Sequence, residues 1–207
     1  MVGRFSRLVV AMTIRMPKWF VGWVSRRYVA GTKLSDAVRV MQRLSKEGAC
    51  FTIDVLGEEI TSMEEATFFL EEYKRVISAI IDNDLDSNLS IKPTAFGLLL
   101  NREKGMENIE TLVKMAQGYD MFVRLDMEDH RVTEDTIQVM LDMHQKGLTN
   151  VGVVLQGRLF RTLDDIERIK QILGPNADYR ICKGIYLEPE EILSLIHISE
   201  PTRPLEI

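Results

Sequence analysis

Residues 121–156 read MFVRLDMEDHRVTEDTIQVMLDMHQKGLTNVGVVLQ, and this stretch decides the fold. It opens and closes on short apolar runs, at residues 121–125 and 151–155. Apolar runs of this length without strict alternation are typical of strands buried on both faces, as in parallel sheets. Between the two runs, Thr133 is placed to cap a helix that ends near Gly147. The stretch therefore predicts a strand, a helix and a second strand parallel to the first.

The same pattern recurs on both sides of this unit. Three further strands are predicted, at residues 49–56, 89–91 and 179–182. Helical spacing of apolar residues predicts the accompanying helices, at residues 34–47, 62–82, 106–118 and 163–173. Strands that recur at intervals of roughly 30–40 residues, with helices between them, indicate a parallel sheet. A doubly wound sheet and a (β/α)8 barrel both fit, and a barrel needs about eight such units.

The composition is that of an ordinary globular protein and excludes several classes of function. Its 207 residues are enough for one domain with a substantial core. A net charge of −5 argues against a nucleic-acid partner. Cys50 and Cys182 lie in apolar runs and are interpreted as buried, reduced thiols of a cytoplasmic protein. The histidines, His130, His144 and His197, lack the spacing of metal ligands, so no metal site is predicted.

The first 35 residues carry seven basic residues and no acidic one, with tryptophan and phenylalanine between them. Their longest apolar run, residues 8–12, is too short to cross a bilayer or to form a signal peptide. Residues 1–33 are therefore predicted to form basic, amphipathic helices. Such helices either lie on an anionic membrane surface or pack against the rest of the protein, and both interpretations stay open.

Polar side chains follow every predicted strand. They are Asp54, Glu58, Lys92, Arg124, Asp126, Glu128, Asp129, Gln156, Arg158, Arg180 and Lys183. Charges that close apolar strands are costly unless they are paired or functional, and the sites of barrels and open α/β sheets lie at the C-terminal strand ends. The set therefore predicts a site, although Asp54 or Arg180 alone also fits a structural ion pair. Glu128 and Asp129 are interpreted as a solvated turn and a helix start. No glycine-rich GxGxxG turn is present, which argues against a Rossmann dinucleotide site.

Six short motifs at these strand ends occur together and in a fixed order. They are RYVAG (27–31), TIDVLGE (52–58), SIKPT (90–94), RLDMED (124–129), VLQ (154–156) and RICKGIY (180–186). In these motifs the sequence resembles the proline dehydrogenase family over roughly residues 27–189. The resemblance implies an α/β fold, a (β/α)8 TIM-type barrel truncated after about five strands, with N-terminal helices.

The resemblance also implies an activity and a set of site residues. The family oxidises L-proline to 1-pyrroline-5-carboxylate with FAD and passes the electrons to a membrane quinone. Lys92, Asp126 and Arg180 match its catalytic residues. The cofactor-binding positions it implies are Lys92, Asp126, Gln156, Arg180, Lys183, Gly184 and Tyr186. Asp54 and Glu58 match a substrate gate. A cytoplasmic protein, peripheral at the inner face of the membrane, is expected.

Domain boundaries follow from the extent of the resemblance. Residues 34–192 are expected to form a partial barrel. Residues 193–207 leave the family pattern and resemble translated sequencing-adaptor sequence, which predicts a non-native tail. The family holds the substrate carboxylate with two adjacent arginines on its last helix, and no such pair follows the fifth strand. The chain on its own is therefore expected to be inactive.

Two alternatives to proline oxidation stay open on the sequence. A lysine such as Lys92 at the end of a barrel strand is also typical of enzymes that form a Schiff base with a carbonyl substrate. The basic N-terminus favours, by itself, an inactive fragment associated with a membrane.

Overall fold

The computed structural model describes residues 17, 20, 24 and 28–194, and the chain divides into two compact units, residues 1–49 and 50–207. In the first unit, helix α3 (Leu34–Ser45) confirms the helix predicted at residues 34–47. The Oδ2 atom of Asp36 accepts the N–H groups of the two residues that precede this helix, Thr32 and Lys33. The predicted N-terminal helices and tail lie largely outside the described residues, and the predicted domain boundaries stay predictions.

The second unit is built on a parallel sheet in the order β1-β2-β3-β4-β5. Its strands are β1 (Phe51–Ile53), β2 (Ser87–Ile91), β3 (Val123–Leu125), β4 (Val151–Gln156) and β5 (Tyr179–Cys182). Each strand pairs in parallel with the next one along the chain. A doubly wound sheet reverses its strand order at a switch point, whereas the strands of a barrel follow one another. The strand order therefore identifies part of a (β/α) barrel, as predicted.

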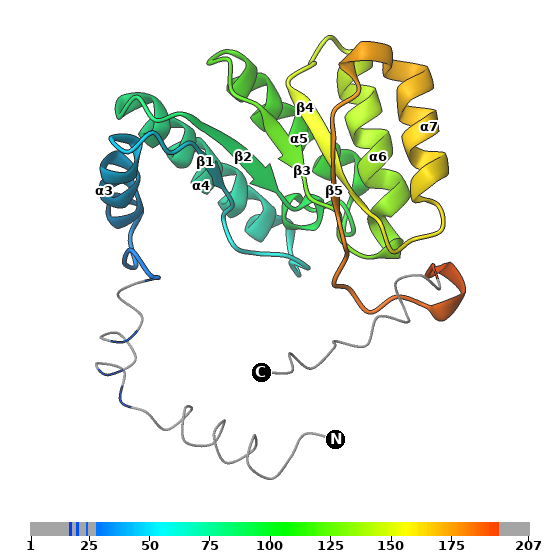
Figure 1. Ribbon diagram of the computed structural model, residues 1–207, viewed down its shortest axis with the longest axis horizontal. Coiled ribbons are helices and arrows are strands. Elements are labelled where there is room, and N and C mark those ends of the chain that lie inside the picture. The colour runs from blue at the N-terminus through cyan, green and yellow to red at the C-terminus, as the bar shows by residue number, and fades with distance from the viewer. Residues whose placement is uncertain (1–16, 18–19, 21–23, 25–27, 195–207) are drawn as a thin grey trace, which may run out of the picture. The chain divides into compact units, whose positions relative to one another are not determined.

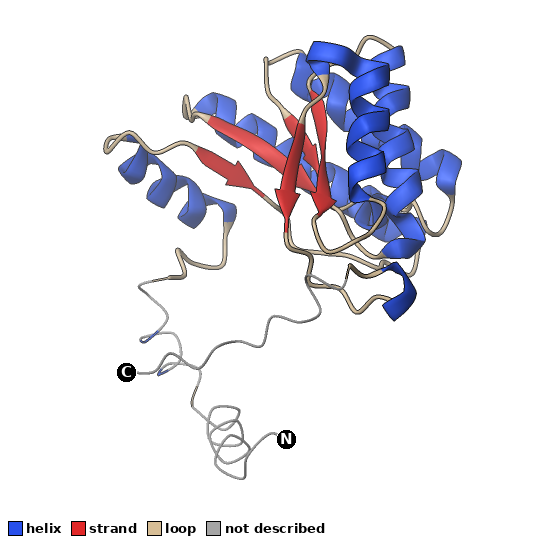
Figure 2. Cartoon of the chain, turned by 45° about the vertical axis from the view of Figure 1, so that its right-hand side comes forward, coloured by secondary structure: helices blue, strands red, loops and turns tan. Residues whose placement is uncertain are grey.

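Four helices connect consecutive strands, and all lie along the same face of the sheet (Figures 1 and 2). They are α4 (Met63–Asp82), α5 (Arg102–Gln117), α6 (His130–Gln145) and α7 (Thr162–Leu173). The 3-10 turns η1 (Pro93–Phe96), η2 (Gly174–Asn176) and η3 (Glu190–Ile192) complete the described elements. The core forms between the sheet and these helices, where Ile91, Ile109, Leu125 and Met140 are fully buried. Every residue of β4 is buried, which confirms the reading of its apolar run.

Two local predictions were wrong. Cys50 is exposed and Cys182 is half-buried, because Cys50 precedes the short strand β1 and Cys182 ends the edge strand β5. Helix α6 is capped by Asp129, whose Oδ1 accepts the N–H of Arg131 at 2.9 Å. Thr133 lies inside the first turn instead and donates its hydroxyl to the carbonyl oxygen of Asp129. A side chain several residues upstream of the expected start therefore took the capping role.

Ser62 begins helix α4 as predicted, because its hydroxyl oxygen accepts the N–H of Glu65 at 3.3 Å. Ser62→Ala is expected to lower the free energy of unfolding by about 1 kcal/mol, measured by urea denaturation. Ser78→Ala on the same helix is the control, because Ser78 only donates to the carbonyl of Lys74 within the helix. Equal losses in the two variants would contradict a capping role.

Candidate active site

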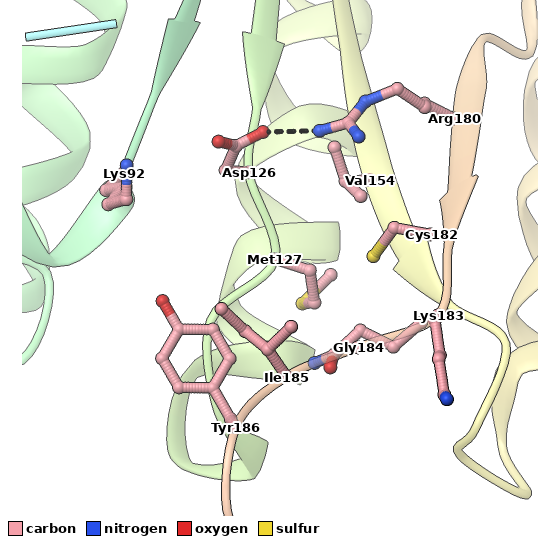
Figure 3. Close-up of a pocket in the computed structure, with 11 residues that line it drawn as sticks. Lys92, Asp126, Met127, Val154, Arg180, Cys182, Lys183, Gly184, Ile185 and Tyr186 are labelled. Atoms are coloured by element: carbon pink, nitrogen blue, oxygen red, sulfur yellow. Dashed lines mark hydrogen bonds and ion pairs between the residues drawn. The ribbon is translucent and has the colours of Figure 1, made fainter. Parts of the chain in front are cut away.

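A pocket of about 360 Å³ lies at the C-terminal ends of the strands (Figure 3). The sequence motifs predicted seven catalytic or cofactor-binding residues, and all of them line this pocket. They are Lys92, Asp126, Gln156, Arg180, Lys183, Gly184 and Tyr186. They come from the ends of β2, β3, β4 and β5, because parallel strands bring their carboxyl ends to one edge of the sheet. The two predicted gate residues, Asp54 and Glu58, contact this set through Lys92 and Tyr186.

Lys92 and Asp54 form an ion pair at one side of the pocket, with 2.5 Å between Nζ and Oδ2. Their side chains are only 17% and 26% exposed, so water screens the pair weakly. Burial by itself lowers the pKa of Lys92. The hydrogen bond and charge of Asp54, with the charges of Asp126 and Glu58, raise this pKa by more than burial lowers it, so the net shift is upward. Lys92 is therefore an ammonium at neutral pH. A Schiff-base lysine needs a depressed pKa, so this arrangement disfavours that alternative.

Tyr73 supports Asp54 from helix α4, and no sequence signal distinguished it from an ordinary core aromatic. Its buried hydroxyl accepts the N–H of Val55 at 3.0 Å. The same hydroxyl lies 3.0 Å from Asp54 Oδ1 and 2.7 Å from the carbonyl oxygen of Ser90, and its single hydrogen serves either acceptor. Burial raises the pKa of Tyr73, and the neighbouring Asp54 adds to the rise, so the phenol stays a neutral donor.

Tyr73→Phe is expected to lower the free energy of unfolding by roughly 1–3 kcal/mol, because it leaves the part-buried N–H of Val55 and the buried carbonyl of Ser90 without this partner. Thermal or urea unfolding measures the loss. Tyr119→Phe is the matched control, because Tyr119 is exposed. A Tyr73→Phe variant as stable as this control would show that the hydroxyl does not support the site.

Asp126 and Arg180 form a second ion pair across the pocket, with 3.0 Å between Oδ1 and Nη2 (Figure 3). The hydroxyl of Ser90 on β2 donates to the same Oδ1 at 2.7 Å, and this second bond fixes the carboxylate of Asp126. Arg180 has 53% of its side chain exposed, and an ion pair this open adds little to stability. Its guanidinium therefore remains available to a ligand in the pocket.

Gln156 and Gly184 form a close contact in the pocket lining. The Nε2 of Gln156 donates to the carbonyl oxygen of Glu128 at 2.7 Å, whereas its buried Oε1 has no partner in the described part of the chain. A Cβ at Gly184 would lie 2.3 Å from that Oε1, and the φ of +95° at Gly184 favours glycine. A buried acceptor without a partner calls for a donor, and a bound ligand in the pocket can supply it.

Comparison with known proteins places these features in a family. The family model described as proline dehydrogenase matches residues 37–200. Proline dehydrogenase 1 of Bacillus subtilis strain 168 is 38% identical over 164 residues, which are 79% of this chain and 53% of that protein. The proline dehydrogenase of Deinococcus radiodurans is 31% identical over 173 residues, 82% of this chain and 55% of that one. The chain belongs to the proline dehydrogenase family.

Solved structures of proline utilization A proteins share the fold of this chain. Proline utilization A (PutA) from Bdellovibrio bacteriovorus, inactivated by N-propargylglycine, matches with a TM-score of 0.71 at 19% identity. The match covers 87% of this chain and 22% of that one. PutA from Corynebacterium freiburgense matches with a TM-score of 0.63 at 18% identity, over 87% and 21% of the two chains. The chain spans about half the length of the curated relatives it matches.

The motif RICKGIY (180–186), which begins within β5, places Lys183 and Tyr186 in the pocket lining with different orientations. Tyr186 donates its hydroxyl to Glu58 Oε2 at 2.9 Å, which joins the ends of β1 and β5. Burial raises the pKa of Tyr186, and Glu58 raises it further, so the phenol stays protonated. The ammonium of Lys183 points away from the Asp126–Arg180 pair in Figure 3.

Two of the charged residues predicted at the strand ends have other positions. Arg124 pairs with Asp178, which precedes β5, so its guanidinium faces the N-terminal edge of the sheet. Gly152 on β4 leaves room for it, since a Cβ there would lie 2.8 Å from Arg124 Nη1. Glu128 is buried, 3% exposed, and the interpretation of a solvated turn was wrong. Asp129 caps the start of helix α6, which confirms the other half of that interpretation, a helix start at this position.

Within the described part of the chain, no helix combines the length and apolarity needed to span a membrane. Those residues also contain no cluster of three or more histidine, cysteine or acidic side chains able to hold a metal ion.

Proposed function

We propose that the protein carrying this sequence oxidises L-proline to 1-pyrroline-5-carboxylate, with FAD as the hydride acceptor and a quinone as the later electron acceptor. One observation carries the proposal. The Lys92–Asp54 and Asp126–Arg180 pairs and the unpartnered Oε1 of Gln156 surround a single pocket. Membership of the family supports L-proline as the substrate. The proposal concerns the whole protein, because the chain spans 53% of proline dehydrogenase 1 of Bacillus subtilis.

The pocket residues suit a flavin ring. Cations near the ring favour its reduced, anionic form, and Arg180 and Lys92 supply two. Gln156 Oε1 offers an acceptor to a ring N–H, and the absence of a Cβ at Gly184 leaves room for that Oε1 in the pocket lining. The residues that would hold the group are Lys92, Asp126, Gln156, Arg180, Lys183, Gly184 and Tyr186. When bound, the flavin supplies the acceptor for the hydride that leaves the substrate.

The oxidation removes a hydride from the ring carbon that is bonded to nitrogen and does not carry the carboxylate. The nitrogen releases a proton to water, and a carbon–nitrogen double bond forms. Proline carries a carboxylate, and Lys92 is a cation held in one position by Asp54. Lys92 therefore attracts and orients the substrate at the pocket. Glu58 and Tyr186, joined by their hydrogen bond, cover one side of the pocket and form the proposed gate.

The full-length protein that carries this sequence provides the test. Purified with added FAD, it is expected to show the absorption bands of an oxidised flavin. L-proline added without oxygen is expected to bleach these bands, and o-aminobenzaldehyde is expected to trap the cyclic imine product. A bound flavin that L-proline leaves oxidised would refute proline as the substrate. Failure to retain FAD at all would refute the flavoenzyme assignment.

The quinone acceptor requires access to a membrane, and the proposed location is the cytoplasmic face, held by the basic residues 1–33. Seven basic and no acidic residues in positions 1–35 support this, because anionic lipids attract such segments. The full-length protein is expected to sediment with anionic vesicles at low salt and to be released at high salt, as screening predicts. Membrane binding without proline oxidation would instead favour the inactive, membrane-associated alternative.

A further inference from the structure

Glu128 is a buried carboxylate between β3 and α6, and its carbonyl oxygen bonds Gln156 of the pocket lining. It is 3% exposed and does not line the pocket. Burying a carboxylate is costly unless hydrogen bonds compensate it. Both of its oxygens have the same partner: the N–H of Thr94 donates to Oε2 at 2.9 Å, and the hydroxyl of Thr94 donates to Oε1 at 2.5 Å.

This pair joins the loops that follow four neighbouring strands. The hydroxyl oxygen of Thr94, after β2, accepts the N–H of Glu59, after β1, at 3.0 Å. The carbonyl oxygen of Glu128, after β3, accepts from Nε2 of Gln156, at the end of β4. Gln156 is held in turn, because its carbonyl oxygen accepts the hydroxyl of Thr162 at 2.5 Å. Glu128 therefore ties the first two loops to the next two.

The chain geometry transmits this restraint to Lys92. Thr94 is separated from Lys92 only by Pro93, whose ring fixes its own φ and limits the backbone of the residue before it. Pro93 and Thr94 are both buried within the turn η1, which begins directly after Lys92. Fixing Thr94 therefore fixes the direction in which Lys92 leaves the sheet.

We propose that Glu128 is a positioning residue, which holds the Lys92 loop through Thr94 and orients Gln156 through its own carbonyl oxygen. It neither lines the pocket nor hydrogen-bonds the Lys92 ammonium, and its hydrogen bonds go to Thr94 and Gln156. The catalytic consequence rests on the proposed proline oxidation, whereas the positioning itself does not.

The two donors of Thr94 show why a side chain with two acceptor oxygens is needed here. Burial raises the pKa of Glu128, while the two bonds from Thr94 lower it, and the net shift is upward. A glutamine of the same shape has one acceptor oxygen, which the Thr94 N–H would occupy, so the hydrogen of the Thr94 hydroxyl would lose its acceptor. Glu128→Gln therefore removes the charge and the acceptor of the Thr94 hydroxyl hydrogen without emptying the volume.

Four variants of the full-length protein test the proposal by steady-state proline oxidation. Glu128→Gln and Thr94→Val are each expected to lower kcat by about tenfold with little change in KM, because misplacing Lys92 reduces the rate more than binding. Thr94→Ser keeps both donors and is expected to retain the wild-type kcat. The double variant Glu128→Gln/Thr94→Val is expected to lose no more than either single variant, since both remove the same link. Additive losses, or failure of Thr94→Ser to retain activity, would overturn the proposal.

Hydrogen–deuterium exchange of the same proteins gives a second reading that needs no turnover. The amides of residues 94–97 are expected to exchange about tenfold faster in Glu128→Gln than in wild type. Glu107→Gln, an exposed glutamate on α5, is the control and is expected to leave this exchange unchanged. Unchanged exchange in Glu128→Gln would overturn the positioning role. If wild type oxidises no proline, the proposed function fails, and exchange alone decides the proposal about Glu128.

Discussion

Lys92→Met in the full-length protein is expected to lower proline turnover by about two to three orders of magnitude. Methionine keeps the length of the side chain but removes the only atom of Lys92 that pairs with Asp54 in the structure. Preorganised charges at a site with little water typically contribute this much to the rate. The variant also leaves the half-buried Asp54 with Tyr73 as its hydrogen-bond partner. Steady-state kinetics with a dye acceptor measures the loss.

Lys114→Met separates this effect from a general loss of lysine. Lys114 pairs with Glu110 on the surface of α5, and its side chain is 59% exposed. A surface pair of this kind contributes about 1 kcal/mol or less, so this variant is expected to keep both stability and activity. A Lys92→Met protein that oxidises proline as fast as Lys114→Met would remove Lys92 from the proposed site.

Gly184→Ala is expected to lower FAD affinity by at least about tenfold and the free energy of unfolding by about 2–4 kcal/mol. The added Cβ would lie 2.3 Å from Gln156 Oε1 and 2.7 Å from Cδ of Arg158. Either Gln156 loses its bond to the carbonyl of Glu128 or the backbone after β5 moves out of the pocket. Flavin titration and urea unfolding measure the two effects.

Gly147→Ala is the matched control for the backbone strain. Gly147 has a φ of +82°, close to the +95° of Gly184, but a Cβ there has no atom within 4 Å. Gly147→Ala is expected to destabilise the protein by about 1 kcal/mol and to leave FAD affinity unchanged. Equal effects at the two positions would mean that strain alone, rather than contact with Gln156, explains Gly184.

The strands were predictable because their signal is local. Apolar runs at residues 151–155 and 179–182 correspond to β4 and β5 with nearly the predicted bounds. Helix starts were less certain, as the capping of α6 by Asp129 shows, because several polar residues near a helix start compete for the same N–H groups. The short strand β1 was predicted too long, because an apolar run does not mark where pairing stops.

The site was predictable only as far as position along the chain determines it. Residues that follow parallel strands meet at one edge, so Lys92, Asp126, Gln156 and Arg180 were expected together and are found together. Arg124 was wrongly placed with them, because its partner Asp178 lies at the opposite end of a strand that is distant in sequence.

The sequence by itself determined the repeating β/α order, the family and the residues that end each strand, because apolar spacing and short motifs are properties of neighbouring residues. Only the tertiary structure decided which polar groups are buried and what they hold. Tyr73 meets Asp54 across 19 residues, Thr94 meets Glu128 across 34, and Tyr186 meets Glu58 across 128. A buried polar group is stabilised only by a partner with matching geometry, and folding alone brings such distant partners together.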